Sequence, residues 1–128
     1  MPLTGQHTRM MSQVSTIRGN VEIEILFFAG CPNSDAALER AREAVALEGV
    51  AANLRMVEIL GTDDAIARRF LGSPTIQVDG EDVETEARVR TDYGFMCRTY
   101  RDSDGNVAGA PSVELISTAI KRRLSPQS

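Results

Sequence analysis

The chain has 128 residues, of which 42% are hydrophobic, so it has the length and the apolar material for one domain with its own core. Its formal charge is −4 and its basic residues are scattered, which argues against nucleic acid as a partner. Only two cysteines, Cys31 and Cys97, are present, which excludes a disulfide framework and makes the reducing cytoplasm the expected location.

The first 20 residues show neither helical nor strand periodicity. We therefore expect a disordered N-terminal tail over residues 1–20 and a single domain over residues 21–124. The one histidine, His7, lies in this tail, which makes it a poor candidate for a catalytic base. We find no apolar run that suits a signal peptide or the roughly 20 residues of a membrane span, so we expect no membrane partner.

A buried strand leading to a cysteine is predicted over residues 21–34, which read VEIEILFFAGCPNS. Apolar residues alternate along this stretch until Phe28, as in a strand that enters the middle of a sheet. Pro32 suits the first position of a helix, which would make Cys31 the residue that caps it. Since a helix N-terminus favours an anion there, we predict that Cys31 is a partly ionised nucleophile. The alternative is a small buried residue, which cysteine often is.

Three helices are predicted downstream. The first runs from Ser34 to about Leu47 and ends at Gly49, with an apolar stripe on one side. The second is a short helix capped by Thr62, with two aspartates in its first turn. The third is amphipathic, begins after Pro111 and carries basic residues at its carboxyl end.

Further strands are predicted between these helices. Residues 53–60 resemble a strand covered on both faces, and residues 76–78 form a strand that Pro74 precedes. The Asp-Gly pair after it would usually indicate a tight hairpin. Because the next convincing strand is 95–101, we expect residues 81–94 to be an inserted, highly charged loop.

This order of elements resembles the thioredoxin-like superfamily, because GCPNS follows the first strand and Ser73-Pro74-Thr75 precedes the third. The resemblance covers residues 20–124. It implies an α/β fold with a central mixed four-stranded sheet flanked by three helices. It also implies that Cys31 is the nucleophile and that a cis-Pro74 loop packs against it. Ser73 would offer backbone hydrogen bonds to a bound thiol or peptide, and the implied substrate-binding residues are Pro32, Ser34, Ser73, Pro74 and Thr75.

Ser34 stands where dithiol members of the superfamily carry their second cysteine. A serine hydroxyl can hydrogen-bond a neighbouring thiolate but cannot release a mixed disulfide by exchange. In this respect the motif resembles that of monothiol glutaredoxins, which use glutathione as the second thiol. Glutathione is therefore a possible co-substrate, and we expect no other cofactor and no resident metal.

A narrower resemblance comes from GCPNS, GSPT-x-x-VDG, YG-x-x-CR-x-Y and the final helix led by GxPS. Together they look like a group of short bacterial thioredoxin-fold proteins that are often labelled alkylmercury lyases. That label implies cleavage of a carbon–mercury bond, which in true organomercurial lyases depends on two cysteines and an aspartate. The present chain lacks the length of that enzyme, so its catalytic residues are not assigned here.

Cys97 decides between the competing functions. It is either a resolving thiol for Cys31 or a packed cysteine, and the sequence favours neither. The first hypothesis is a thiol–disulfide oxidoreductase in which Cys31 attacks the disulfide bond of a disulfide-bearing or glutathionylated partner, and Cys97 or glutathione resolves the product. The expected partner is a thiol- or disulfide-bearing protein or small molecule. The second is a protein that binds a thiophilic metal such as mercury, or an iron–sulfur cluster bridged between two chains. The third is a non-catalytic binding module. The sequence leaves the oligomeric state open.

Overall fold

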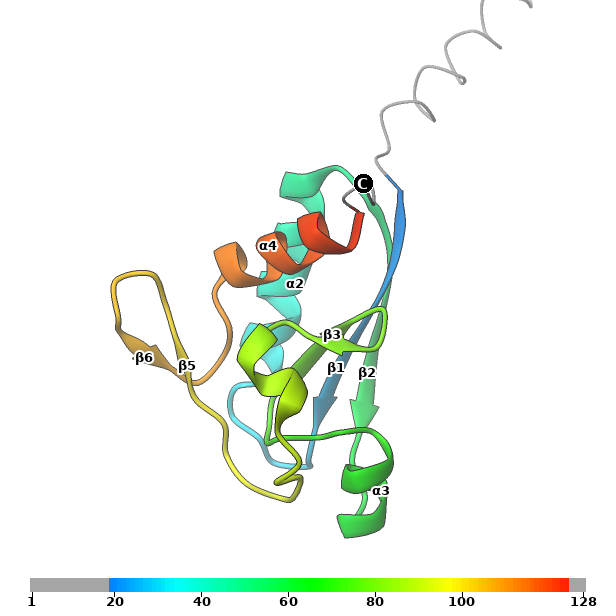
Figure 1. Ribbon diagram of the computed structural model, residues 1–128, viewed down its shortest axis with the longest axis vertical. Helices are drawn as coiled ribbons and strands as arrows, with labels where there is room; N and C mark the ends of the chain where they lie inside the picture. The colour runs from blue at the N-terminus through cyan, green and yellow to red at the C-terminus, as the bar shows by residue number, and fades with distance from the viewer. Residues whose placement is uncertain (1–18, 125–128) are drawn as a thin grey trace, which may run out of the picture.

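The computed structural model describes residues 19–124 (Figure 1). The predicted tail lies outside the described residues except for Gly19 and Asn20, and so does His7. Asn20 already belongs to the first strand, so the domain begins slightly before the predicted boundary. Among residues 19–124, none of the helices combines the length and the apolar character that crossing a bilayer requires.

A mixed four-stranded sheet forms the centre of the structure. Its strands are β1 (Asn20–Phe27), β2 (Ala51–Glu58), β3 (Thr75–Val78) and β4 (Glu81–Asp82), in the order β2-β1-β3-β4. β1 is parallel to β2, whereas β3 is antiparallel to both β1 and β4. The prediction of an α/β protein with a mixed four-stranded sheet is confirmed.

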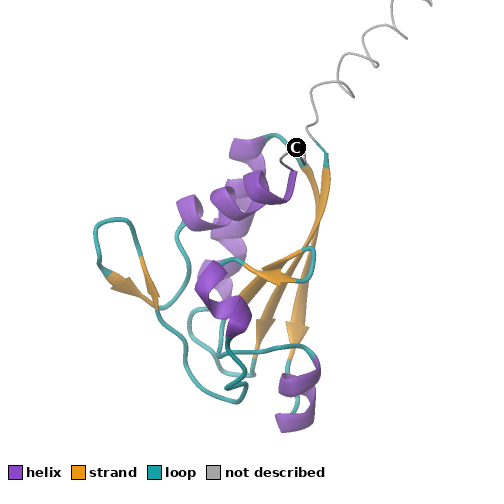
Figure 2. Cartoon of the chain, viewed as in Figure 1, coloured by secondary structure: helices purple, strands orange, loops and turns teal. Residues whose placement is uncertain are grey.

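Three α-helices accompany the sheet, as predicted: α2 (Ser34–Glu48), α3 (Thr62–Ala67) and α4 (Val113–Leu124). A short 3-10 helix, η1 (Thr85–Val89), follows β4. Helices α2 and α4 pack together over one face of the sheet, while α3 lies at the end where β1 and β2 finish (Figures 1 and 2). Within the described part of the chain, most of the other face therefore has no helix over it.

The alternation in β1 explains this arrangement. Val21, Ile23 and Ile25 are buried on the face that α2 and α4 cover. On the opposite face Glu22 and Glu24 contact polar side chains of β2, where Glu24 forms an ion pair with Arg55 and Glu22 accepts a hydrogen bond from Asn53. Only the carboxyl end of that face is apolar, and there a smaller cluster closes the core: Leu26, Ile59, Ala65 and Phe70.

Two helix boundaries follow the sequence closely. Gly49 ends α2 in the left-handed conformation, with φ of 62°, which glycine adopts without strain. Ser112 begins α4, because its hydroxyl accepts a hydrogen bond from the Leu115 N–H at 3.0 Å. The first and last long helices therefore lie where they were predicted.

Several predictions for the strands are wrong. The strand β2 was expected to be covered on both faces. Each of its residues is exposed or half-buried, because β2 is an edge strand of the sheet. The Asp79-Gly80 pair does form a tight hairpin, since both residues have positive φ as in a mirror-image turn. Residues 81–94 are consequently not an inserted loop, because they contain β4 and η1.

The predicted strand over residues 95–101 is also wrong. Only its last two residues form a strand, β5 (Tyr100–Arg101), which pairs with β6 (Val107–Ala108) in a hairpin separate from the main sheet (Figure 1). Before β5 the chain makes a single parallel β-bridge, between Ser73 and Cys97. This bridge is the centre of the site described next.

Candidate functional site

Cys31 lies in the turn between β1 and α2, and its thiol is free and half-buried. Its backbone N–H donates to the Phe28 carbonyl at 3.2 Å, and Gly30 inside this turn has a positive φ of 87°. We call residues 28–31 the Cys31 turn. The residue that caps α2 is Asn33, so the predictions that Cys31 caps the helix and that Pro32 is its first residue are wrong. A second turn through Pro32 and Asn33 separates the thiol from the helix.

Ser34 is the first residue of α2 and lies close to the Cys31 turn. Its hydroxyl donates a hydrogen bond to the Cys31 carbonyl oxygen at 3.3 Å. We expected the Ser34 hydroxyl to hydrogen-bond the Cys31 thiolate. In the structure it donates to the Cys31 backbone instead. Asn33, next to it, packs on Gly109, where a Cβ atom would come within 2.3 Å of its amide nitrogen.

The Ser73-Pro74 peptide bond is cis, as the resemblance implied. Ser73, Pro74 and Thr75 are all buried. The Thr75 hydroxyl donates to the Gly72 carbonyl at 2.6 Å, which closes the turn from within. The Ser73 hydroxyl oxygen accepts a hydrogen bond from the Phe28 N–H at 3.4 Å. The cis-proline loop therefore contacts the Cys31 turn directly through Ser73.

Cys97 lies on the other side of Ser73, in residues 96–98, which we call the bridging segment. The Ser73 N–H donates to the Met96 carbonyl at 2.9 Å, and the Arg98 N–H donates to the Ser73 carbonyl at 3.1 Å. Gly72 permits this close approach, because a Cβ atom there would lie 2.9 Å from the Arg98 Cβ. Both backbone groups of Ser73, which we expected to bind a thiol or peptide, are thus occupied by the chain itself. The thiol of Cys97 is free and exposed.

A buried cation fixes the bridging segment. The Arg98 side chain is 3% exposed and donates to both carboxylate oxygens of Asp82, at 2.7 and 2.8 Å. It also donates to Glu84 at 2.8 Å and to the Thr75 hydroxyl at 3.1 Å. Burial by itself lowers the pKa of the Arg98 guanidinium, but Asp82, with contributions from Tyr100 and Glu84, outweighs it, so that the pKa is raised and the group stays charged.

Tyr100 completes this cluster. The Arg98 guanidinium carbon lies 4.6 Å from the centre of the Tyr100 ring, a cation–π contact. The Tyr100 hydroxyl donates to the Pro74 carbonyl at 2.5 Å, which links the bridging segment a second time to the cis-proline loop. Burial raises the pKa of Tyr100 well above its usual value, although the nearby Arg98 cation lowers it in part.

The structure therefore brings Cys97 next to Ser73 and Pro74, whereas Cys31 is connected to Ser73 through Phe28, the first residue of its turn. Ser73 contacts the Cys31 turn through its hydroxyl and the Cys97 segment through its backbone. Sequence reasoning missed the buried group that supports this arrangement, Arg98 with Asp82 and Tyr100, because Asp82 was assigned to a solvated loop. The Asp79-Gly80 turn was the signal that could have identified β4 and hence Asp82. Within residues 19–124, no three side chains of the ligating types come together to hold a metal ion.

An apolar groove of about 320 Å³ opens beside the Cys31 turn. We call it the aromatic groove. Its rim carries two exposed apolar side chains, since Leu60 is 78% and Phe95 is 50% exposed. The rings of Phe28 and Phe95 stack with centroids 5.7 Å apart. Six residues line the groove: Phe28, Ala29, Glu58, Ile59, Leu60 and Phe95.

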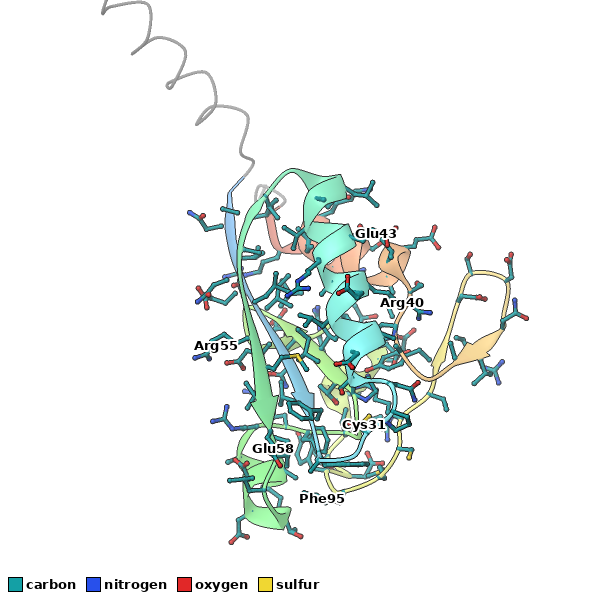
Figure 3. All side chains as sticks on the ribbon, turned by 180° about the vertical axis from the view of Figure 1, so that it is seen from behind. Cys31, Arg40, Glu43, Arg55, Glu58 and Phe95 are labelled. Carbon is teal, nitrogen blue, oxygen red and sulfur yellow. The ribbon has the colours of Figure 1, made fainter. Side chains whose placement is uncertain are left out.

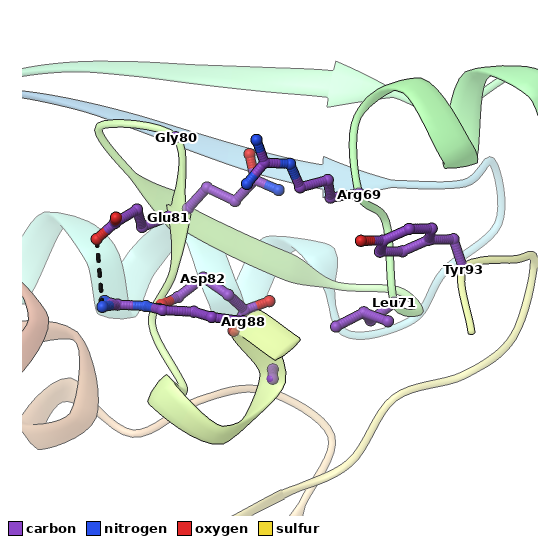
Figure 4. A pocket seen from close by; sticks show the side chains of 9 residues that line it. Arg69, Leu71, Gly80, Glu81, Asp82, Arg88 and Tyr93 are labelled. Carbon is purple, nitrogen blue, oxygen red and sulfur yellow. Dashed lines mark hydrogen bonds and ion pairs between the residues drawn. The ribbon is translucent and has the colours of Figure 1, made fainter. Parts of the chain in front are cut away.

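A second hollow, of about 210 Å³, lies beside the β3–β4 hairpin (Figure 4). Arg69, Arg88 and Tyr93 are among the residues that line it, and Arg88 forms an ion pair there with Glu81 at 3.2 Å. None of the predicted site residues faces this hollow. It borders the Arg98 cluster only through Asp82, so we do not assign the thiol chemistry to it.

Comparisons with protein-family models, with curated proteins and with solved structures found no match to this chain.

Proposed function

We propose that the protein has a thioredoxin-like fold and acts as a thiol–disulfide oxidoreductase, with Cys31 as the nucleophile and Cys97 as the resolving thiol. The observation that carries the proposal is the position of Ser73. This buried residue hydrogen-bonds the turn that holds Cys31 and the segment that holds Cys97. The order of strands and helices and the cis-Pro74 loop beside the Cys31 turn support the fold assignment.

The reaction proceeds in two exchange steps. The Cys31 thiolate attacks one sulfur of a substrate disulfide, a bond forms between the two sulfurs, and the other half of the substrate leaves as a thiolate that takes a proton from water. The Cys97 thiolate then attacks the Cys31 sulfur and releases the second half of the substrate. The substrate is reduced by two electrons and the protein ends as a Cys31–Cys97 disulfide. A low-molecular-weight thiol restores the dithiol by the reverse exchange.

The two thiols are free in the structure, which is the state that begins this cycle. We place the reaction in the reducing cytoplasm, where free thiols are maintained between turnovers. Ser34 takes no part in the exchange, because its hydroxyl contacts a carbonyl and carries no sulfur.

The test is the mass of the intact protein after treatment with one equivalent of a small disulfide, followed by peptide mapping. We expect the loss of a pair of hydrogen atoms and a Cys31–Cys97 link. Cys97→Ser is expected to accumulate a mixed disulfide on Cys31, whereas Cys31→Ser is expected to undergo no rapid exchange.

Each alternative result contradicts a defined part of the proposal. A mixed disulfide that persists on Cys31 in the unaltered protein would show that an external thiol such as glutathione, and not Cys97, resolves it. Exchange that survives Cys31→Ser at the original rate would overturn the role of Cys31. If neither cysteine reacted, the protein would be a binding module.

A further inference from the structure

The aromatic groove and the Cys31 turn share one wall. Phe28 and Ala29 line the groove, and the Cys31 N–H donates to the Phe28 carbonyl at 3.2 Å. Figure 3 shows Cys31, Glu58 and Phe95 together at one end of the sheet. The groove therefore adjoins the turn that carries the Cys31 sulfur, to which a disulfide would attach its substituent.

The neighbouring strand edge is closed. An extended polypeptide commonly binds by adding a strand to a free sheet edge, where unpaired N–H and C=O groups receive it. At Ser73 both backbone groups are already paired with Met96 and Arg98. The segment cannot easily be displaced, because the Arg98 side chain is buried and bound to Asp82 and Glu84. A polypeptide substrate thus finds no edge to pair with beside Cys31.

The charge of the groove disfavours anions. Glu58 is the one charged residue that lines it, and no lysine or arginine does so. Glu58 is exposed and, within the described part of the chain, has no hydrogen bond or ion pair through its side chain. Asp35 adds a second carboxylate in the first turn of α2, just after the Cys31 turn. An anionic substituent in the groove would meet the Glu58 carboxylate, and no cation among the lining residues compensates for it.

We propose that the aromatic groove is the substrate subsite of Cys31 and that it takes a small disulfide with an apolar, neutral or cationic substituent. Polypeptide strands and anionic disulfides such as oxidised glutathione are disfavoured. The inference rests on the proposed function, since it names the substrate class of the same exchange reaction.

The experiment uses the Cys97→Ser protein, in which the mixed disulfide on Cys31 stays trapped for measurement by mass. Four probes are compared: cystamine, which is cationic, hydroxyethyl disulfide, which is neutral, and two anions, dithiodipropionate and oxidised glutathione. Each rate is divided by the rate of the same probe with the neutral thiol N-acetylcysteine amide, which removes the intrinsic reactivity of the probe. At low ionic strength we expect cystamine to exceed dithiodipropionate about sevenfold, from charges roughly 7 Å apart in water.

Glu58→Gln is expected to bring the ratio of the normalised cystamine and dithiodipropionate rates close to one. Glu43→Gln is the matched control, because Glu43 is also exposed but lies farther along α2, away from Cys31 (Figure 3). It should leave the ratio unchanged. Adding about 0.5 M salt should also reduce the ratio, since screening shortens the range of exposed charges. For polypeptide substrates the probe is insulin, with which we expect no mixed disulfide on the timescale of the small probes.

The outcomes separate the two proposals. If dithiodipropionate and oxidised glutathione reacted as fast as cystamine after normalisation, the assignment of the groove would be overturned while the exchange chemistry stood. A rapid mixed disulfide with insulin would overturn the restriction to small molecules. If no probe reacted with Cys31, the proposed function itself would fail.

Discussion

Cys31 lies on a turn held by hydrogen bonds, whereas Cys97 lies on a segment that the buried cation of the adjacent Arg98 anchors. The contacts of the Cys31 turn span 3.2 to 3.4 Å, and its residues Ala29 and Gly30 are exposed. The bridging segment is bonded to Ser73 at 2.9 and 3.1 Å, and the Arg98 side chain beside Cys97 is 3% exposed.

This difference assigns different mechanical roles to the two thiols. Regions with few buried contacts and solvent-exposed hydrogen bonds open at low free energy, while buried clusters open only with the whole domain. In the proposed reaction Cys31, as the nucleophile, would lie on the part that adjusts to an incoming disulfide. Cys97, as the proposed resolving thiol, would keep its position, and the Cys31 turn would move towards it.

The largest expected effect is that of Arg98→Leu. Removing the cation leaves Asp82 buried without its partner, and breaking a buried ion pair in this way costs about 3 to 5 kcal/mol. The measurement is the free energy of unfolding from urea denaturation. Arg101→Leu is the control, because Arg101 is exposed and, among residues 19–124, its guanidinium donates only to the Gly105 carbonyl. It should cost less than about 1 kcal/mol.

If Arg98→Leu does not fold, a double variant still tests the contribution of the ion pair to stability. Replacing both partners, as Arg98→Leu with Asp82→Leu, removes the unpaired charge and should recover part of the loss. A loss below about 1 kcal/mol in Arg98→Leu alone would show that the bridging segment is no more firmly held than the Cys31 turn.

The two segments also differ in how far the sequence predicted them. The strand before Cys31 and the helix after it follow from local patterns, namely alternation and the helical stripe, whereas the cis-Pro74 loop was implied by the resemblance that the Ser-Pro-Thr motif carries. The support of Cys97 depends on Arg98 and Asp82, which are 16 residues apart and charged. Charged residues usually indicate solvent, so a buried ion pair across two short segments carries no local signal.

The position of Cys31 relative to α2 shows the opposite error. Pro32 is a good residue for the start of a helix, but Asn33 and Gly109 pack together, and the helix begins at Ser34. The residue that caps the helix thus lies against a residue far away in the sequence. The prediction from the helix-starting preference of Pro32 placed the Cys31 thiol closer to the N-terminus of α2 than it lies in the structure.

An intermediate effect is expected from the dependence of the unfolding free energy on pH, to which Tyr100 contributes. Because burial raises its pKa in the folded state, the unfolded chain releases this proton first, near pH 10. Stability from this group is therefore fully present below about pH 10 and is lost as the pH rises above it. Tyr100→Phe loses the hydrogen bond to the Pro74 carbonyl and should cost about 1 to 2 kcal/mol at pH 7.

The difference in unfolding free energy between the unaltered protein and Tyr100→Phe should then shrink between pH 9 and pH 11. Chemical denaturation at fixed pH values measures it. Because the chain has two tyrosines, a Tyr93→Phe background leaves Tyr100 as the single source of tyrosinate absorbance. Titration of that band near pH 10 in the folded protein would contradict the buried contact between Tyr100 and the Pro74 carbonyl. The bridging segment would then be held less firmly than we infer.

The smallest effect is expected at Ser34, on the loosely held side. Ser34→Ala removes a hydrogen bond of 3.3 Å to the Cys31 carbonyl, which should cost about 0.5 kcal/mol. Ser112→Ala is the matched control, since that hydroxyl accepts the Leu115 N–H at 3.0 Å and its loss should cost about 1 kcal/mol. Because the Ser34 hydroxyl contacts a carbonyl, the pH profile of Cys31 alkylation should be unchanged. A shifted profile would mean that the hydroxyl turns to the thiolate when the Cys31 turn moves, and Ser34 would then be a positioning residue for the nucleophile.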